Sequence, residues 1–340
     1  MAKELPLVSI LIVNWNGKKH LKEALGSIKR ITHKNYEVII VDQGSNDGSV
    51  SYIKKGHPYV KLVEIKENLG FAGGNNVGVK YARGKYILFL NNDTKLEPDF
   101  LTYLVRAIAE KGVGVVQPKI LFYDGAEIQS TGSFLTKSGF LFHRGYGAPR
   151  DSYNEPDYIF SANGSSMLVR RALIERIGLF DEDFFAYFEE SDFCWRAWNA
   201  GYKVKYEPRA VVYHKGGQTS KALANDFVQF HSFKNRLCSI LKNSRGVQLV
   251  YMPIVNFIFS EAASIAFLLS ARFKNFWAVQ RAIFWNILNI SKTLEKRKRL
   301  DVKSGEWQDY MKRVVFINPS FDYYYYLFFD LKKYEEAKKI

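Results

Sequence analysis

The sequence predicts an α/β fold, with a mainly parallel central sheet flanked by helices and an α-helical extension at the C-terminal end. Two observations lead to this prediction. Short β-branched runs alternate with segments of helical periodicity in the first part of the chain, which is the pattern of crossovers between parallel strands. From Asn225 onward the pattern changes to long amphipathic helices. We therefore expect a catalytic or binding domain in residues 1–224 and a helical region in residues 225–340.

Each predicted strand in the first part is a short run rich in β-branched and aromatic residues. These runs lie at residues 8–13, 36–41, 60–65 and 86–90. Helical periodicity predicts helices between them, at residues 21–28, 50–54 and 77–82. We expect the glycine-rich stretch "NLGFAGGNN" to be a loop that precedes the last of these helices.

The pattern becomes less regular after the fourth strand. Residues 117–157 are rich in Gly, Ser and aromatic residues, which predicts short strands and a long loop. A helix is predicted at residues 172–177, followed by "GLFDEDFFAYFEESDF", a loop that enters another helix. A strand then runs from Val204 to Tyr213 and ends at His214.

Composition and charge exclude several classes of protein. Hydrophobic residues make up 47% of the 340 residues, which excludes a disordered scaffold. A net charge of +15 favours contact with phosphate groups, but no helix-turn-helix, zinc-finger or RNA-binding signature is present, so we expect no nucleic-acid partner. Cys194 and Cys238 lie far apart, which supports neither a disulfide nor a cysteine metal site. The N-terminal apolar run is too short for a signal peptide and is predicted to be the first strand.

Four polar segments follow the predicted strands, and they share amide, carboxylate and glycine residues. They are "NWNG", "DQGSNDG", "NLGFAGGNN" and "NNDT". In open parallel sheets the ligand crevice lies outside the carboxyl ends of the strands, which is where these segments fall. The sequence therefore predicts a binding site for a phosphorylated ligand at that edge.

The "NNDT" and "VDQGSNDGS" segments each allow two interpretations. Asp93, at the end of a strand, could bind a divalent cation that bridges a diphosphate, or it could cap the following helix. Asp42, Gln43, Ser45 and Asp47 suit a base edge or ribose hydroxyls, but they also suit an ordinary Asx turn. The residues alone do not decide between these interpretations.

The "YFEESDFCWR" segment places Glu189, Glu190 and Asp192 within four positions. Crowded carboxylates raise the pKa of at least one member, which suits a general base. Asp192 lies four residues before Arg196 and is expected to form an ion pair with it, which leaves Glu190 as the freer candidate. The alternative is an acidic first turn that complements the helix dipole. His214 could ligate a cation, or it could be a structural histidine.

The C-terminal region combines apolar, aromatic and basic residues. Residues 249–271 are largely apolar but are interrupted by Pro253, Asn256 and Glu261, so they fall short of a clean membrane span. Trp and basic residues alternate up to the run "KRKR", and the tail "FDYYYYLFFDLKKY" follows. This mixture is typical of interfacial helices on anionic lipid. The alternative is a packing domain or a homo-oligomer interface.

In this order, the motifs resemble the inverting family 2 glycosyltransferases, which have the GT-A fold, and especially the rhamnosyltransferase-like members that extend cell-surface glycans. The resemblance covers residues 7–243 and rests on six segments. They are "VSILIVNWNG", "VDQGSNDGS", "NLGFAGGNN", "LFLNNDT", "GLFDEDFFAYFEESDFCWR" and "VYHKGG".

The resemblance implies a role for each matching position. Asp93, with Asn91 as an atypical first member, matches the metal-binding DxD-type motif for Mg²⁺ or Mn²⁺, and His214 matches a position that helps to bind the metal. Glu190 matches the catalytic base, where Asp is usual, so either the acceptor sits slightly differently or Asp192 takes a larger share. The nucleotide-sugar site is expected at Val13, Asn14, Asn16, Asp42, Gln43, Ser45, Asn68, Gly70, Asn75 and Asn92.

The implied reaction is a single displacement with inversion, in which Glu190 deprotonates the acceptor hydroxyl and a nucleoside diphosphate departs. The expected donor is a UDP-, dTDP- or GDP-linked sugar carrying rhamnose or another hexose. The expected acceptor is a glycan or lipid-linked acceptor at the cytoplasmic face of the cell membrane, in the synthesis of cell-surface polysaccharide or glycoconjugate. Two alternatives are a polyprenyl- or dolichyl-phosphate glycosyltransferase and a non-catalytic sugar-nucleotide-binding module.

Overall fold

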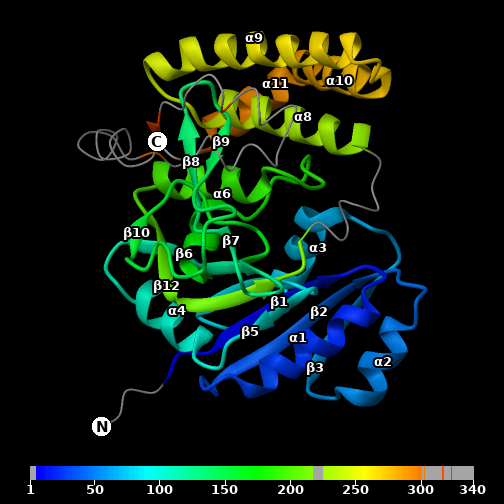
Figure 1. Ribbon diagram of the computed structural model, residues 1–340, viewed down its shortest axis with the longest axis vertical. Helices are drawn as coiled ribbons and strands as arrows, with labels where there is room; N and C mark the ends of the chain where they lie inside the picture. Colours follow the sequence, from blue (N-terminus) through cyan, green and yellow to red (C-terminus); the bar gives the residue numbers. More distant parts are fainter. Residues whose placement is uncertain (1–4, 217–224, 301, 303–315, 318–322, 324–340) are drawn as a thin grey trace.

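The computed structural model describes residues 5–216, 225–300, 302, 316–317 and 323 (Figure 1). Its largest sheet has ten strands, eight of them in the order β10-β12-β6-β11-β4-β1-β2-β3, with β5 paired to β12 and β7 paired to β6. Their bounds are β1 (Val8–Asn14), β2 (Tyr36–Gln43), β3 (Val60–Ile65), β4 (Tyr86–Asn91), β5 (Thr94–Leu96), β6 (Val113–Phe122), β7 (Ile128–Ser130), β10 (Asp157–Tyr158), β11 (Ser166–Arg170) and β12 (Lys203–His214).

The sheet is mixed but mainly parallel, as the sequence predicts. Strands β3, β2, β1 and β4 run parallel to one another, and β12 runs parallel to β6. Strand β11 is antiparallel to both β4 and β6 and joins the two parallel groups. The carboxyl ends of β1, β2 and β4 therefore meet at one edge of the sheet.

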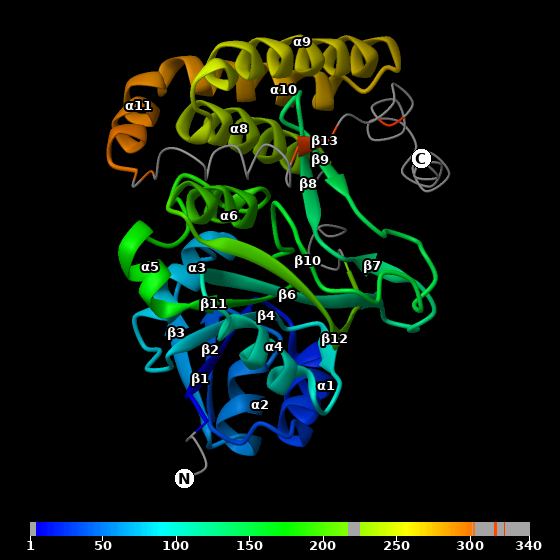
Figure 2. The same cartoon turned by 90° about the vertical axis from the view of Figure 1, so that its left-hand side faces the viewer.

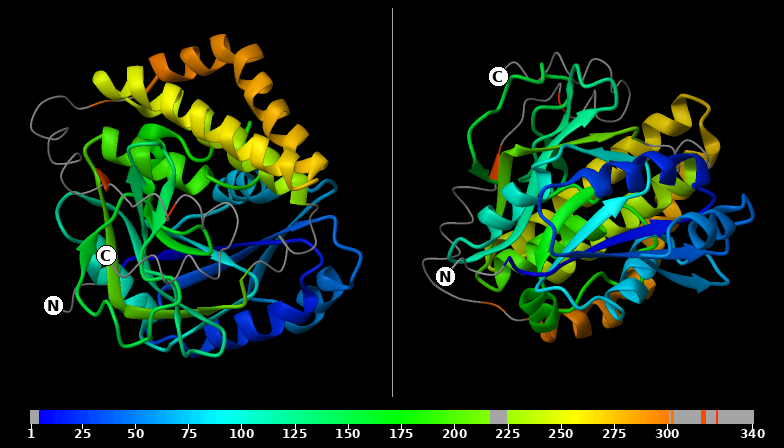
Figure 3. Two further views of the ribbon diagram at one scale, coloured as in Figure 1. Left: turned by 45° about the horizontal axis from the view of Figure 1, so that its top comes forward. Right: turned by 90° about the horizontal axis from the view of Figure 1, so that it is seen from below.

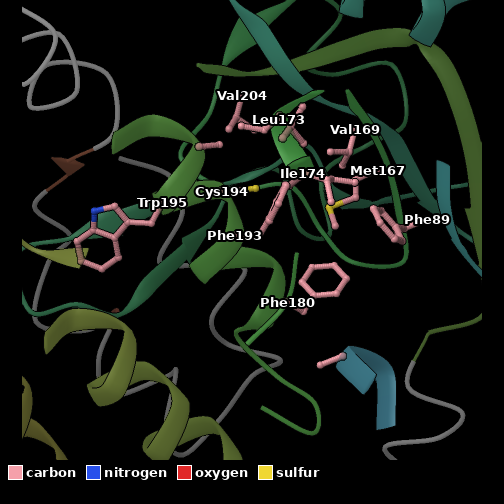
Figure 4. Close-up of a cluster of buried hydrophobic side chains, with 14 of the residues drawn as sticks. Phe89, Met167, Val169, Leu173, Ile174, Phe180, Phe193, Cys194, Trp195 and Val204 are labelled. Atoms are coloured by element: carbon pink, nitrogen blue, oxygen red, sulfur yellow. The ribbon is translucent and has the colours of Figure 1, made fainter. Parts of the chain in front are cut away.

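Two hydrophobic cores cover the two faces of this sheet. Alternation along β1 sends Leu11 into one core and Ile10 and Ile12 into the other. The core that contains Leu11 also holds Trp195 and Phe180, and Figure 4 shows a part of it. The helices around the sheet are α1 (Lys18–Arg30), α2 (Ser49–Gly56), α3 (Gly70–Val79), α4 (Phe100–Ile108), α5 (Arg171–Ile177) and α6 (Glu189–Asn199).

The prediction of a glycine-rich loop at "NLGFAGGNN" is wrong, because helix α3 begins at Gly70 and ends at Val79. Its glycines serve close packing rather than a turn. A Cβ atom on Gly78 would lie 2.3 Å from a side-chain carbon of Leu11, and one on Gly74 would lie 2.8 Å from a side-chain carbon of Val13. The helix can therefore lie directly against β1 only because these positions have no side chain.

The irregular region at residues 117–157 contains a hairpin that extends away from the large sheet. Strands β8 (Ser133–Thr136) and β9 (Leu141–His143) form a small sheet with β13 (Phe316–Ile317). Phe140, next to the hairpin turn, is fully buried among aromatic side chains of the C-terminal helices, including Phe233 and Phe259. The hairpin thus joins the sheet domain to the C-terminal helices.

Within the described residues, four C-terminal helices lie at the end of the molecule farthest from α2 (Figures 1 and 2). They are α8 (Asn225–Asn243), α9 (Val247–Leu269), α10 (Phe273–Leu288) and α11 (Ile290–Lys298). Helix α8 packs on α6, while α9 forms the outermost layer in Figures 1 and 2. Figure 3 shows the same helices, in yellow and orange, from two further sides. The segment "KRKR" lies at the C-terminal end of α11. The tail "FDYYYYLFFDLKKY" lies outside the described residues except for Tyr323.

Helix α9 is long and apolar enough to cross a membrane by length and composition, although the sequence suggested that its polar residues prevent this. The mean hydropathy of its apolar window is 1.7, and 33% of that window is buried inside the protein. Because part of the helix already packs on α8 and α10, composition by itself is weak support for a membrane span.

Candidate active site

A pocket of about 350 Å³ lies at the carboxyl ends of β1, β2 and β4, between α3 and the start of α6. It contains nine of the residues that the sequence assigns to the site. The lining is formed by Val13, Trp15, Gln43, Asn68, Gly70, Phe71, Asn91, Asn92, Asp93, Asn163, Gly164, Ser165, Phe185, Ala186, Tyr187, Glu189, Glu190 and His214. The polar segments therefore converge on one cavity.

Strand pairing brings Asp93 and His214 together although 120 positions separate them in the chain. His214, at the end of β12, pairs in register with Thr94 at the start of β5. As a result, Nε2 of His214 lies 3.1 Å from Oδ1 of Asp93, and both side chains are buried. Burial opposes ionisation of Asp93, but the hydrogen bond and the charge of His214, the charge of His20 and a backbone hydrogen bond together outweigh it and hold the pKa of Asp93 below its ordinary value.

Asp93 does not cap a helix. Strand β5 follows it immediately, and helix α4 begins only at Phe100, after Asp99. The capping interpretation of "NNDT" is therefore excluded, and the carboxylate is directed to the pocket instead.

The donor set around Asp93 fits a divalent cation. Nδ1 of His214 donates to Oε1 of Gln129 at 2.6 Å, and Nε2, on the other side of the ring, lies 3.1 Å from Oδ1 of Asp93 and 3.2 Å from the amide of Asn91. A bound cation would take the place of the proton that Nε2 donates to Asp93, with both side chains as its ligands. Two ligands on adjacent positions of an octahedral ion lie about 3 Å apart. Among the described residues no group of three or more His, Cys, Asp or Glu side chains could hold a metal, so amides, water or a ligand phosphate would complete the coordination.

Several predicted nucleotide-site residues are absent from the lining of the pocket and belong to a hydrogen-bond network beside it. Nδ2 of Asn14 donates to Asp42 at 2.8 Å, and Asn92 donates to Oδ1 of Asn14 at 2.8 Å. Ser45 is bound to Asp42 through its backbone N–H and accepts the backbone N–H of Asn16. This network connects the loops after β1 and β2 and so supports Asn92, which does line the pocket.

Gln43 and Asn75 are both engaged with α3. Oε1 of Gln43 accepts the N–H of Leu69 at 2.9 Å, and its Nε2 donates to the carbonyl of Gly70. Gln43 lines the pocket while holding the first turn of the helix. Asn75 is buried, donates to the carbonyl of Phe71, and is absent from the pocket lining.

Asp192 lies away from the pocket, and the prediction that it shares the proton chemistry does not fit its surroundings. Its carboxylate is fully buried and lies 2.9 Å from Nε of Arg196 and 3.0 Å from Nζ of Lys242. Ser239 and Asn243 also donate to it. The predicted pair with Arg196 is confirmed, and the two cations hold the pKa of Asp192 below its ordinary value despite burial.

Glu190 has the environment that a general base requires. It lines the pocket, and its buried Oε2 has no hydrogen-bond partner within the described part of the chain. Burial raises the pKa of Glu190 to about 7. Glu189 beside it has a pKa well above its ordinary value, first because of burial and then because of the charge of Glu190. The crowding expected from the sequence contributes, but desolvation is the larger cause.

Sequence reasoning missed several residues of the pocket. Trp15 stands within the quoted "NWNG" and is 39% exposed at the pocket, so its position in that motif could have indicated it. Phe185 and Tyr187 come from the aromatic stretch "FFAYF". Such a stretch in a sequence predicts residues of the hydrophobic core rather than of a pocket. Asn163 lines the pocket from an irregular segment that carries no signal in the sequence. Gln129, in β7, does not line the pocket but contacts His214, and only the tertiary structure brings it there.

Comparisons with known proteins agree with this geometry. The family model for glycosyl transferase family 2 matches residues 9–178. The chain is 27% identical over 198 residues to the low-salt glycan biosynthesis hexosyltransferase of Haloferax volcanii, covering 56% of this chain and 61% of that one. It is 26% identical to the poly-beta-1,6-N-acetyl-D-glucosamine synthase of Staphylococcus epidermidis, covering 61% and 49%. The chain thus spans about half to three-fifths of these relatives.

Solved structures show the same fold at low identity. A mannosyltransferase from Pyrobaculum calidifontis, solved with GDP-Man and Mn²⁺, is 17% identical with a TM-score of 0.55, covering 99% of this chain and 89% of that one. Fragment 1–349 of TarS from S. aureus, solved with UDP, is 17% identical with a TM-score of 0.54, covering 98% and 90%. These likenesses establish the GT-A fold.

Proposed function

Because the chain belongs to glycosyl transferase family 2, we propose that it is an inverting glycosyltransferase that moves a hexose from a nucleoside-diphosphate sugar to a glycan or lipid-linked acceptor. One observation carries this proposal. The Asp93–His214 pair faces the same pocket as Glu190, whose Oε2 has no hydrogen-bond partner among the described residues. A cation-binding pair and a base in one cavity are the two groups that a single displacement from a diphosphate requires.

The donor is bound at the carboxyl edge of the sheet. Asp93 and His214 would hold Mg²⁺ or Mn²⁺, which when bound neutralises the charge of the diphosphate. Trp15 offers an aromatic surface beside Val13 and Gln43, which suits a UDP, dTDP or GDP base. Similar structures were solved with GDP-Man and Mn²⁺ and with UDP, which supports a donor of this class.

Glu190 performs the proton transfer. In its carboxylate form it accepts the proton of the acceptor hydroxyl while that oxygen forms a bond to the anomeric carbon. The bond between the anomeric carbon and the diphosphate breaks, and the nucleoside diphosphate leaves with the electron pair. Attack and departure occur on opposite faces, so the configuration inverts.

The reaction is expected at the cytoplasmic face of the cell membrane, with an anionic lipid surface as partner. The outer faces of α9 and α10 expose large apolar side chains, among them Ile258 (58% exposed), Leu269 (82%) and Trp277 (61%). Exposed Arg272 lies in the turn between the two helices, and exposed Lys274 lies in the first turn of α10. An apolar stripe bordered by cations suits a peripheral or monotopic contact with anionic lipid.

Vesicle flotation tests the membrane contact. The wild-type protein should float with vesicles that contain phosphatidylglycerol, and Ile258→Glu with Leu269→Glu should remove binding. Leu5→Glu is a matched control, because Leu5 is 50% exposed at the opposite end of the molecule. If the wild-type protein ignores the vesicles and forms an oligomer that Ile258→Glu dissociates, the face is an oligomer interface instead.

A nucleotide screen tests the enzymatic proposal. Thermal shift with UDP, dTDP and GDP, each with Mn²⁺ or Mg²⁺, should show stabilisation by one nucleotide, since a ligand that binds only the folded state raises its stability. Sugars linked to that nucleotide should then release the nucleoside diphosphate. Binding without turnover across the panel would point to a sugar-nucleotide-binding module.

A further inference from the structure

The segment that delivers Glu190 to the pocket has an unusual backbone. Tyr187 and Phe188, just before α6, both have φ of +71°, and neither is a glycine. Left-handed conformations of bulky residues persist only where surrounding contacts hold them. The direction in which α6 starts, and with it the position of Glu190, therefore depends on what holds these two residues.

Asn235, in the middle of α8, makes that contact. Its Nδ2 donates to the carbonyl of Ala186 at 3.0 Å and to the carbonyl of Tyr187 at 2.7 Å. The side chain is fully buried, and its Oδ1 has no hydrogen-bond partner in the described part of the chain. Two carbonyl acceptors can be satisfied only by the amino group, so the orientation of the amide is determined by the turn.

Charged contacts hold the same segment on either side of Asn235. Nζ of Lys234 donates to the carbonyl of Asp183 at 2.5 Å. Lys242 lies 2.6 Å from Asp181, and Lys296 of α11 pairs with both Asp181 and Asp183. The C-terminal helices thus hold the outer side of the loop that forms one wall of the pocket, and α8 lies on α6 in Figures 1 and 2.

We propose that Asn235 is a positioning residue for catalysis: by fixing the carbonyls of Ala186 and Tyr187, it holds Glu190 where it can reach the acceptor hydroxyl. This inference rests on the proposed function, in which Glu190 is the base. It assigns part of the active-site scaffold to a helix outside the region that the family model matches. Asn235 itself does not line the pocket, so it acts through the backbone of residues 186–188.

The test compares Asn235→Asp with a matched variant of the full-length protein, Asn256→Asp. Asn256 is also buried, also donates Nδ2 to a loop carbonyl, that of Ser138 at 3.0 Å, and also has an Oδ1 without a partner among the described residues. It differs in holding the β8–β9 hairpin instead of the turn before α6. Aspartate keeps the shape of each side chain but removes the donor.

Both variants should lower the melting temperature, but only Asn235→Asp should lower kcat, on the order of 100-fold as expected for misplacement of a reacting group. The assay is nucleoside-diphosphate release from whichever UDP-, dTDP- or GDP-sugar turns over. Donor KM and stabilisation by the free nucleotide should stay unchanged. The acid limb of the kcat profile should move to lower pH, because a displaced Glu190 is better solvated.

Equal kcat losses in the two variants, or a loss in Asn235→Asp explained by weaker donor binding, would overturn the positioning role. If Asn235→Asp does not fold, Asn235→Ser replaces it, since serine cannot span both carbonyls. Glu190→Gln is measured in parallel. An inactive Glu190→Gln with a normal Asn235→Asp overturns this inference but leaves the proposed function intact, whereas an active Glu190→Gln overturns the base assignment and this inference together.

Discussion

Replacing Glu190 with glutamine should remove transfer and yet stabilise the protein above neutral pH. Burial raises the pKa of Glu190 from 4.5 to about 7. In the window between these values the folded protein binds a proton that the unfolded chain has released, so the free energy of unfolding falls as pH rises. The difference between the two pKa values corresponds to a loss of about 3 kcal/mol in the free energy of unfolding. This loss is complete above pH 7 and absent below pH 4.5.

Chemical denaturation at pH 4.5 and pH 8 measures this effect. Glutamine carries no charge, so Glu190→Gln should be about 3 kcal/mol more stable than the wild-type protein at pH 8 and nearly equal to it at pH 4.5. Nucleotide binding should persist, while kcat should fall by about 10²- to 10⁴-fold. Glu182→Gln, at an exposed position of the same acidic segment, is the control and should change neither quantity. A variant that is no more stable at pH 8, or that retains full kcat, would refute the reasoning.

Three further changes test other parts of the site. Asp93→Ala should weaken Mn²⁺-dependent binding of the nucleotide, and EDTA should do the same to the wild-type protein; isothermal titration that shows no effect of either would exclude a metal role for "NNDT". Asp192→Asn should lower the free energy of unfolding by about 3–5 kcal/mol, because buried Arg196 loses its carboxylate partner and buried Lys242 loses one of its two, and unchanged stability in urea would contradict its structural role. In Gly17→Ala the new Cβ would lie 2.1 Å from Nδ2 of Asn92, so we expect a loss of about 1–3 kcal/mol together with weaker nucleotide binding. An alanine variant that binds the nucleotide normally would show that the bridge from Asn92 to the loop below is dispensable.

Predictions from the sequence were most successful where the residues of a single segment are enough to identify its secondary structure. The runs that predict β1, β2 and β3 are apolar and β-branched, and the structure confirms their type and place. The pair between Asp192 and Arg196 follows from helical spacing and is confirmed. By contrast, the first part of helix α3 was predicted as a loop, and only its end falls within the helix predicted at residues 77–82. Glycine disfavours helices in sequence patterns, and the need for close packing on β1 is visible only in three dimensions.

The acidic segment "FEESDF" shows a second limit of prediction from sequence, which is the assignment of roles to neighbouring carboxylates. Sequence alone left Glu190 and Asp192 as joint candidates for the base. The structure separates them, because Lys242 from α8 neutralises Asp192 while no described group pairs with the buried Oε2 of Glu190. Asp192 and Lys242 are fifty positions apart, and their contact produces no pattern in the sequence around either residue. No rule based on residue spacing could therefore have predicted it.

The sequence by itself determined the class of fold, the edge of the sheet at which the candidate pocket lies and the identity of most polar side chains there, because strand runs and the polar residues that end them are local features. Tertiary structure alone decided that His214 meets Asp93 with Gln129 behind it, and that Asn235 holds the turn before α6. These contacts join segments that are distant in the chain, and they form only when the sheet closes and the C-terminal helices pack against it.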